Sequence, residues 1–319
     1  MKFSFWIHNG EYDPLINAFN GQTLNISTST NTYINPFDSS LQYEKDNEDA
    51  LNNKIEFVLA FIESLVSSKG GAGLTGEQIT IVDRCAKTIY EEYQMSNYKK
   101  ELEPDFYKFY EELLKQPEEE AKNLALILER YVIGGMDIFA KDTNIEIKNK
   151  FISFNIAELP RSIQTTGYLV ILEHVMDRLR KNKNLGKHTW IFIDEFHILL
   201  SNQFSSDYIA KLYKTGRKEN AIPTIITQNI ADVLKNADGC KILSNSEFAM
   251  ILKQKPLDLP PICKIFDISN EEANYVTDSP AGQGIIVYGE DKVAFRNQVS
   301  KESYIYELNQ TSNFQVNRS

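Results

Sequence analysis

Two adjacent carboxylates, Asp194 and Glu195, directly follow a short apolar run, Trp190 to Ile193. An apolar run without alternation is typical of a strand that is covered on both faces in a parallel sheet. Acidic groups just beyond the carboxyl end of such a strand lie where α/β proteins bind their ligands. There, one carboxylate can hold a magnesium ion through water and the next can polarise an attacking water, which is the chemistry of nucleotide hydrolysis. The alternative is a strand that simply ends in two solvated acids.

The residues after this acidic pair predict a second strand with its own polar end. A helical pattern is followed by Gly216 to Lys218 and then by an apolar strand, Ile222 to Ile226, which ends in Thr227 and Gln228. The order strand, helix, strand indicates a βαβ unit of a doubly wound sheet. Gln228 would then lie beside the acidic pair, where it could sense a phosphate or the attacking water. Arg217 could neutralise charge on a phosphate in a neighbouring subunit, or it could be an ordinary solvated cation at a helix end.

Two stretches of sequence carry a specific resemblance. IDEFHILL at residues 193–200 and TGRKENAIPTIITQN at residues 215–229 resemble the carboxyl-terminal motor domain of the VirB-four/TraC-type ATPases of type IV secretion and conjugative transfer. Residues 9–38 and 151–159 match the same family in the same order, so the resemblance covers nearly the whole chain. It implies an α/β fold of the RecA-like P-loop NTPase type, with a mostly parallel sheet flanked by helices and a helical insertion.

The resemblance also implies roles for individual residues. Asp194, in the place of the Walker B acid, would hold Mg²⁺ through water, and Glu195 would orient the attacking water. Arg217 and Gln228 would complete the catalytic set. The residues expected to contact the nucleotide are Asp194, Thr227 and Glu11.

One element of the family is expected to be missing. The family has a phosphate-binding loop, G-x-x-x-x-G-K-[ST], before the segment that matches residues 9–38, and the sequence printed here begins at Met1. Residues 71–76 fit G-x-x-x-x-G, but Glu77 and Gln78 then replace the lysine and the hydroxyl that phosphate and magnesium require. Thr75 and Gln78 instead predict a capping box at the start of a helix. We therefore expect a truncated motor domain that binds ATP weakly and hydrolyses it negligibly alone.

Composition and charge limit the other classes of function. The formal net charge of −10 argues against nucleic-acid binding by bulk electrostatics. Most of the excess lies in residues 41–130, which hold 19 acidic and 11 basic residues. Three cysteines without C-x-x-C spacing and four histidines without ligand spacing indicate reduced thiols and no structural zinc site. No apolar run approaches the length of a transmembrane helix.

The pattern along the chain predicts four segments. They are the first strands of the motor domain at 1–40, a helical subdomain at 41–145, the rest of the motor domain at 146–308 and a flexible tail at 309–319. Within the third segment we expect a basic turn over Lys181 to Lys187 and a second turn at Asp238 and Gly239. The strand from Glu247 to Leu252 carries apolar residues on one side.

Three functions follow from these expectations. The first is a motor-domain fragment of a secretion ATPase that uses ATP and Mg²⁺, assembles as a homo-hexamer and works with membrane-channel components at the cytoplasmic face of the cell membrane. The second is a non-catalytic assembly protein, or a split half that a separate P-loop subunit completes. The third is a relative of the DNA-pumping coupling proteins. The acidic charge and the match at residues 31–38 favour the first function over this one.

Overall fold

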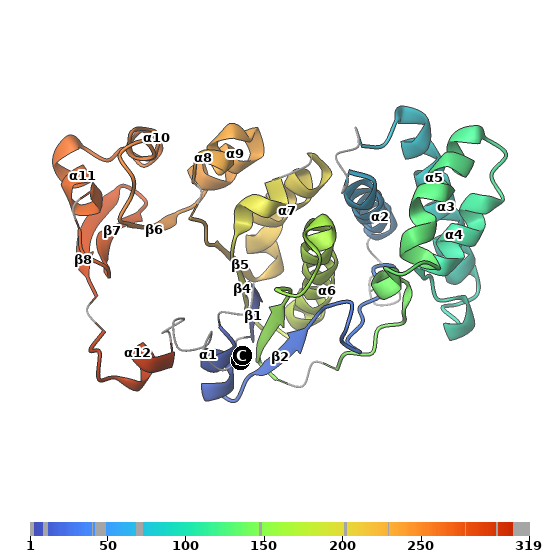
Figure 1. Ribbon diagram of the computed structural model, residues 1–319, viewed down its shortest axis with the longest axis horizontal. Helices are drawn as coiled ribbons and strands as arrows, with labels where there is room; N and C mark the ends of the chain where they lie inside the picture. The colour runs from blue at the N-terminus through green and yellow to red at the C-terminus, as the bar shows by residue number, and fades with distance from the viewer. Residues whose placement is uncertain are drawn as a thin grey trace. The chain divides into compact units, whose positions relative to one another are not determined.

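The protein is described by a computed structural model for residues 3–8, 12–39, 41, 49–67, 73–146, 149–200, 203–228, 230–277, 279–297 and 299–308. Contacts divide the chain into two compact units, Met1–Ile226 and Thr227–Ser319 (Figure 1). The predicted tail at 309–319 and the predicted site residue Glu11 lie outside the described residues. The four-segment division made from the sequence stays a prediction.

The first unit is built on a parallel sheet. Its strands are β1 (Phe3–His8), β2 (Gln22–Asn25), β3 (Phe151–Asn155), β4 (Thr189–Ile193) and β5 (Ala221–Ile225). They lie in the order β2-β3-β1-β4-β5, and every pairing is parallel. Residues such as Ile152, Phe154, Ile191 and Ile193 are fully buried, as expected for strands that are covered on both faces. The predicted α/β class with a mostly parallel sheet is confirmed.

The outer edge of β5 is protected against further pairing. Among the described residues β5 pairs only with β4. Pro223, in the middle of the strand, has no N–H to offer, and the backbone N–H of Ile225 is hydrogen bonded to the hydroxyl of Tyr213. Proline and covered donors are usual devices that prevent edge strands from recruiting another chain.

Helices connect and cover these strands. The longer ones in the sheet layer are α1 (Asp13–Ala18), α6 (Gln164–Asn184) and α7 (Gln203–Thr215). Short 3₁₀ helices are η2 (Lys100–Leu102), η3 (Asp137–Ala140), η4 (Arg161–Ile163), η5 (Phe196–Leu200) and η6 (Gly216–Glu219). The sequence predicted a basic turn from Lys181 to Lys187. The prediction was wrong for its first part, because α6 continues to Asn184. The buried amide of Asn182 donates to the Thr189 hydroxyl at 3.1 Å, which fixes this last turn of helix against β4.

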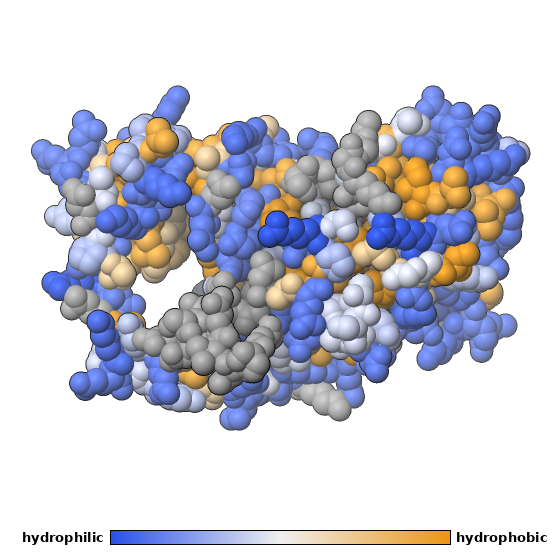
Figure 2. Space-filling model, viewed as in Figure 1, coloured by the Kyte–Doolittle hydropathy of each residue, from blue (hydrophilic) through white to orange (hydrophobic). Residues whose placement is uncertain are grey.

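A helical bundle is attached to the side of α6. It consists of α2 (Ala50–Ser67), α3 (Gly76–Met95), α4 (Phe106–Leu114) and α5 (Glu119–Val132), and Figure 1 shows α2 between α6 and the other three helices. Phe37, Phe61, Phe106 and Phe109 pack ring against ring in its core. The capping box predicted at Thr75 is confirmed, and α3 begins directly after it. Figure 2 shows hydrophobic residues at the surface over this bundle.

The second unit holds a small antiparallel sheet. Its strands are β6 (Phe248–Leu252), β7 (Gln283–Tyr288) and β8 (Asp291–Arg296), and its helices are α8 (Ile230–Lys235), α9 (Ala237–Ser244), α10 (Leu259–Ile265), α11 (Asn270–Thr277) and α12 (Tyr304–Leu308). One face of the sheet packs against α10 and α11 through a core that includes Ile251, Ile262 and Val276. The opposite face exposes Phe248 and Met250 by more than half of their surface.

A local correction concerns Asp238 and Gly239. They lie inside α9 rather than in a turn, because the side chain of Asn236 accepts hydrogen bonds from both of their N–H groups and so begins a helix there. Across the described residues, none of the helices combines the length and the apolar character that crossing a membrane requires.

Candidate functional site

Asp194 lies at the carboxyl edge of the parallel sheet, between two neighbouring strands. Its backbone N–H donates to the carbonyl of Ile7 in β1 at 3.0 Å. On the other side the N–H of Ile226 donates to the carbonyl of Ile193 at 2.8 Å. These ladder bonds hold the strand end in place, and Asp194 is only 9% exposed. The position is the one that the sequence predicted for the first acid.

The pKa of the Asp194 carboxyl group is set by burial and by two hydrogen-bond donors. Burial raises its pKa above the ordinary value, while hydrogen bonds from the Glu195 N–H and from the Tyr12 hydroxyl lower it and only partly offset the effect. The Glu195 N–H lies 2.9 Å from Oδ1. A cation beside this carboxylate would offset the remaining cost of keeping its charge away from water.

Glu195 has an unusual backbone conformation. Its φ is +49°, in the left-handed region that residues with a Cβ rarely adopt. Directly after it, Phe196 and Leu199 turn back into the core and are 0% and 1% exposed, which forces the tight change of direction. The Glu195 Oε2 atom lies 3.2 Å from Nδ1 of His197. Outliers of this kind concentrate at functional sites, where the surrounding structure holds them.

Two tyrosines contact Asp194 and were missed by sequence reasoning. Tyr168 in α6 donates its hydroxyl to the backbone carbonyl of Asp194 at 2.9 Å, and Tyr12 hydrogen bonds the Asp194 carboxylate. Burial, followed by the charges of Asp194 and Glu195, raises the pKa of Tyr168 strongly, so the phenol stays protonated and donates. Tyr12 stands next to Glu11 in the matched segment, which could have marked it. Tyr168 only continues the apolar pattern of its helix.

The remaining predicted site residues occupy other places. Arg217 is exposed in η6, which precedes β5, so it lies at the opposite edge of the sheet from Asp194. Five residues of strand separate the two edges, about 16 Å at roughly 3.3 Å per residue. Within one chain Arg217 therefore does not meet the acidic pair. Thr227 and Gln228 directly follow Ile226 and belong to the second unit by their contacts, with Gln228 exposed.

The residues that are present fit the metal side of a nucleotide site. Magnesium in such sites is held by one or two carboxylates, waters and phosphate oxygens, and the buried Asp194 would be such a carboxylate. Among the described residues no group of three His, Cys, Asp or Glu side chains could hold a metal ion by itself. The glycine-containing stretch at residues 71–76 does not supply a phosphate cradle at its described end. Thr75 already caps the first turn of α3 there, together with Gln78.

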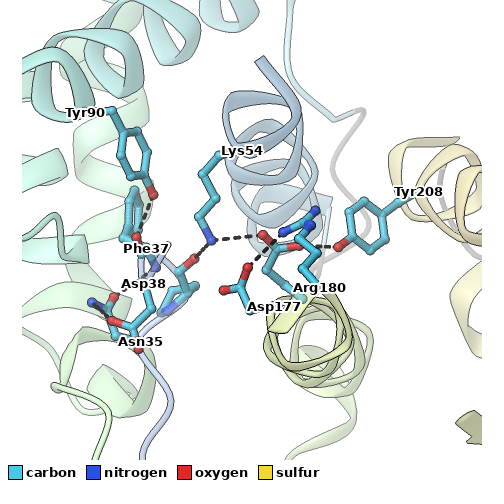
Figure 3. A network of polar contacts seen from close by, with 10 residues as sticks. Asn35, Phe37, Asp38, Lys54, Tyr90, Asp177, Arg180 and Tyr208 are labelled. Atoms are coloured by element: carbon cyan, nitrogen blue, oxygen red, sulfur yellow. Dashed lines mark hydrogen bonds and ion pairs between the residues drawn. The ribbon is translucent and has the colours of Figure 1, made fainter. Parts of the chain in front are cut away.

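A buried polar network connects the helices α2, α6 and α7 (Figure 3). Lys54 of α2 donates to Oε1 of Glu173 in α6 at 3.1 Å and to the carbonyl of Pro36 at 2.9 Å. Tyr208 of α7 donates to the other carboxylate oxygen of Glu173. Burial raises the pKa of Glu173, but Lys54, Arg180 and the Tyr208 hydroxyl outweigh it, so the pKa lies below its ordinary value.

The same network holds the loop at residues 33–38. Asn35 donates to Oδ1 of Asp38 at 2.8 Å and to the carbonyl of Pro104 at 2.9 Å. Tyr90 of α3 donates to the carbonyl of Phe37 at 2.7 Å, as Figure 3 shows. This segment, which matched the family closely in sequence, therefore fastens the helical bundle to the sheet layer.

Comparison with known proteins agrees with this architecture. The model of the TraG P-loop domain family matches residues 7–318. The structure of VirB4 of Thermoanaerobacter pseudethanolicus is similar with a TM-score of 0.80 and 21% identity, covering 94% of this chain and 82% of that one. Nothing among the curated proteins matches.

Two structures of the bacterial conjugative coupling protein TrwBdeltaN70 are also similar. The trigonal form in complex with sulphate gives a TM-score of 0.56 at 12% identity, over 94% of this chain and 80% of that one. The unbound monoclinic form gives 0.57 at 11% identity, over 95% and 80%. These likenesses concern the RecA-like P-loop fold, while the family match spans nearly the whole sequence. The chain therefore belongs to the TraG P-loop domain family and has the fold that VirB4 and TrwB share.

Proposed function

We propose that this chain is part of the ATP-hydrolysing motor of a type IV secretion or conjugative transfer system. The observation that carries the proposal is the buried Asp194 with Glu195 at the carboxyl edge of the parallel sheet, in a member of the TraG P-loop domain family. Asp194 would hold Mg²⁺ through water, and Glu195 would orient the water that attacks the γ-phosphate. Thr227, Gln228 and Glu11 would complete the nucleotide contacts.

The phosphate side of the site would come from a segment outside residues 1–319. Backbone N–H groups of a glycine loop and its lysine supply most of the grip on a triphosphate, and the motif G-x-x-x-x-G-K-[ST] does not occur in this sequence. Purified residues 1–319 should therefore bind ATP weakly and hydrolyse it negligibly. Supplying a strand–GxxxxGK[ST]–helix segment from a member of the family should produce magnesium-dependent hydrolysis.

The test compares ATP hydrolysis by residues 1–319 with and without that segment. Glu195→Gln should abolish the rate gained, while Glu219→Gln, at a half-buried glutamate that is ion-paired with Lys183, should leave it unchanged. A robust rate from residues 1–319 alone that Glu195→Gln abolishes would contradict the division of the site proposed here. Reading the coding sequence upstream of Met1 would show whether such a segment precedes it.

Arg217 would act on the nucleotide of a neighbouring subunit in a ring, by analogy a hexamer. Its place at the edge opposite Asp194 suits action between subunits rather than within one. Removing an arginine of this kind costs about 10³-fold or more in turnover. With the phosphate-binding segment supplied, Arg217→Ala should therefore be nearly inactive and the matched Lys218→Ala nearly as active as the unsubstituted protein. Mixing Arg217→Ala with Glu195→Gln subunits should restore part of the activity. If mixing restores nothing, Arg217 has no such role.

A non-catalytic assembly protein is the second candidate. The observation in its favour is the face of the second unit's sheet on which Phe248 and Met250 are 56% and 53% exposed. Surfaces of this kind mark interaction sites in soluble proteins. Under either candidate the partners would be components of a membrane channel, at the cytoplasmic face of the membrane. Absence of hydrolysis with every phosphate-binding segment tried would favour the assembly protein.

A further inference from the structure

The peptide bond between Asp194 and Glu195 is held at both of its polar groups. Its carbonyl oxygen accepts a hydrogen bond of 2.9 Å from the Tyr168 hydroxyl. Its N–H donates at 2.9 Å to Oδ1 of Asp194 itself. A rigid, planar peptide can only rotate as a unit, so a flip would carry the carbonyl and the N–H to opposite sides and break both bonds together.

The orientation of this peptide decides where Glu195 points. Rotation of the peptide changes φ of Glu195, which now has the strained value of +49°. The chain beyond is fixed, because Phe196 donates its N–H to the carbonyl of Ile226 at 3.1 Å and Ile198 donates to the carbonyl of Glu195 at 3.0 Å. Because the chain on either side stays in place, a rotation of the peptide would change ψ of Asp194 and φ of Glu195 together. It would tilt the Cα–Cβ bond of Glu195 and so displace the carboxylate at the end of that side chain.

Tyr168 is placed to resist that rotation. It is fully buried in α6, so its ring cannot move without disturbing the core. The same helix carries Glu173, five residues further on, whose carboxylate is bound by Lys54 of α2 and by Tyr208 of α7. Tyr168 therefore belongs to a helix, α6, that is itself bonded to α2 and to α7.

We propose that Tyr168 is a positioning residue that locks the Asp194–Glu195 peptide, and so presents the Glu195 carboxylate to the attacking water. The inference rests on the proposed function, because it supports the role given there to Glu195. It assigns to α6 a part in the chemistry although none of its side chains has to touch the nucleotide.

The first test measures the amide of Glu195 by hydrogen exchange and NMR in two matched variants. Tyr168→Phe removes the hydroxyl that holds the peptide. Tyr90→Phe removes a hydroxyl that is equally buried and also bonded to a backbone carbonyl, but in the helical bundle. Exchange of the Glu195 amide should accelerate about tenfold or more in Tyr168→Phe only, since roughly one hydrogen bond is lost. Equal exchange in both variants overturns the proposal.

A second variant covers the case in which Tyr168→Phe does not fold. Glu195→Gly keeps Tyr168 and removes the penalty of the left-handed conformation, because glycine adopts positive φ freely. The amide at position 195 should then stay protected, since the peptide is still held by the hydroxyl. Fast exchange in this variant would show that the Glu195 side chain, and not Tyr168, fixes the peptide.

The third measurement uses ATP hydrolysis with the phosphate-binding segment supplied. Tyr168→Phe should lower kcat and leave KM for ATP unchanged, because it displaces the group that orients water and not those that bind the nucleotide. Tyr90→Phe should change neither constant. An unchanged kcat in Tyr168→Phe refutes the role in presenting Glu195. If the unsubstituted protein hydrolyses nothing, the proposed function fails, whereas the exchange experiment still decides whether Tyr168 holds the peptide.

Discussion

Replacing Lys54 by methionine should destabilise the first unit far more than replacing an exposed lysine in a similar ion pair. Lys54 and Glu173 are 5% and 6% exposed in their side chains and lie 3.1 Å apart. Methionine keeps most of the length and apolar volume of the lysine but removes its charge and its three donors. The Glu173 carboxylate would then stay buried with only Tyr208 and the charge of Arg180 to stabilise it.

The expected magnitude follows from this burial. Removing one partner of a buried ion pair costs about 3–5 kcal/mol, because it leaves an uncompensated charge in a medium of low polarity. Arg180 and Tyr208 remain, so we expect the lower end, about 3 kcal/mol, in the free energy of unfolding. Lys211 provides the matched control, because it pairs with Glu56 at the shorter distance of 2.6 Å but both side chains are largely exposed, at 45% and 63%. Lys211→Met should cost less than about 1 kcal/mol.

The assay is urea denaturation followed by circular dichroism, with Lys54→Met, Lys211→Met and the double variant Lys54→Met/Glu173→Leu. The double variant should recover much of the loss, because neither charge then remains buried. A cost for Lys54→Met that is no greater than for Lys211→Met would refute the reasoning. So would a double variant that is less stable than Lys54→Met, since packing rather than charge would then be the cause.

Three further predictions concern other parts of the chain. Burial of the His174 ring lowers its pKa from 6.5 to about 4, so between these pH values the unfolded chain binds a proton that the folded chain does not. The free energy of unfolding should therefore fall as the pH drops from 6.5 to about 4, by up to about 1.4 kcal/mol per pH unit. His174→Leu should remove this pH dependence from urea denaturation curves. Thr75→Ala should cost about 1 kcal/mol in the free energy of unfolding, because it removes the hydroxyl half of the capping box with Gln78; an unchanged urea midpoint would refute this. Gly284→Ala should lower the melting temperature of the second unit, because the added Cβ would lie 2.1 Å from the carbonyl oxygen of Ile251.

Sequence reasoning succeeded where the signal is local. The apolar run before Asp194 predicted β4 because a strand covered on both faces has few polar positions, and the acids had to follow at its carboxyl end. The capping box at Thr75 involves groups only three residues apart, and α3 begins there as predicted. The turn predicted at Asp238 failed because Asn236, two residues earlier, caps a helix there.

Other features depended on contacts between distant segments. The bond from Tyr168 to the Asp194 carbonyl joins residues 26 positions apart, and Tyr168 looks like any other apolar position of its helix. Lys54 and Glu173 are 119 positions apart, and neither shows in the sequence that its partner is another buried charge. The apolar alternation in β6 also did not show which face of the strand is buried. Phe248 lies on the exposed face, whereas Ile251 lies in the core.

The sequence by itself determined the class of fold and the place of the acidic pair, because strand periodicity, capping and motif spacing depend on neighbours along the chain. The family followed from the resemblance of whole stretches to known motor domains. The tertiary structure alone decided which groups act on that pair. It set Arg217 at the opposite edge of the sheet, fixed Glu195 in a left-handed conformation and brought Tyr12 and Tyr168 to Asp194. The physical reason is that side-chain environment, and with it charge state and orientation, is created by segments that meet only when the sheet and its helices pack.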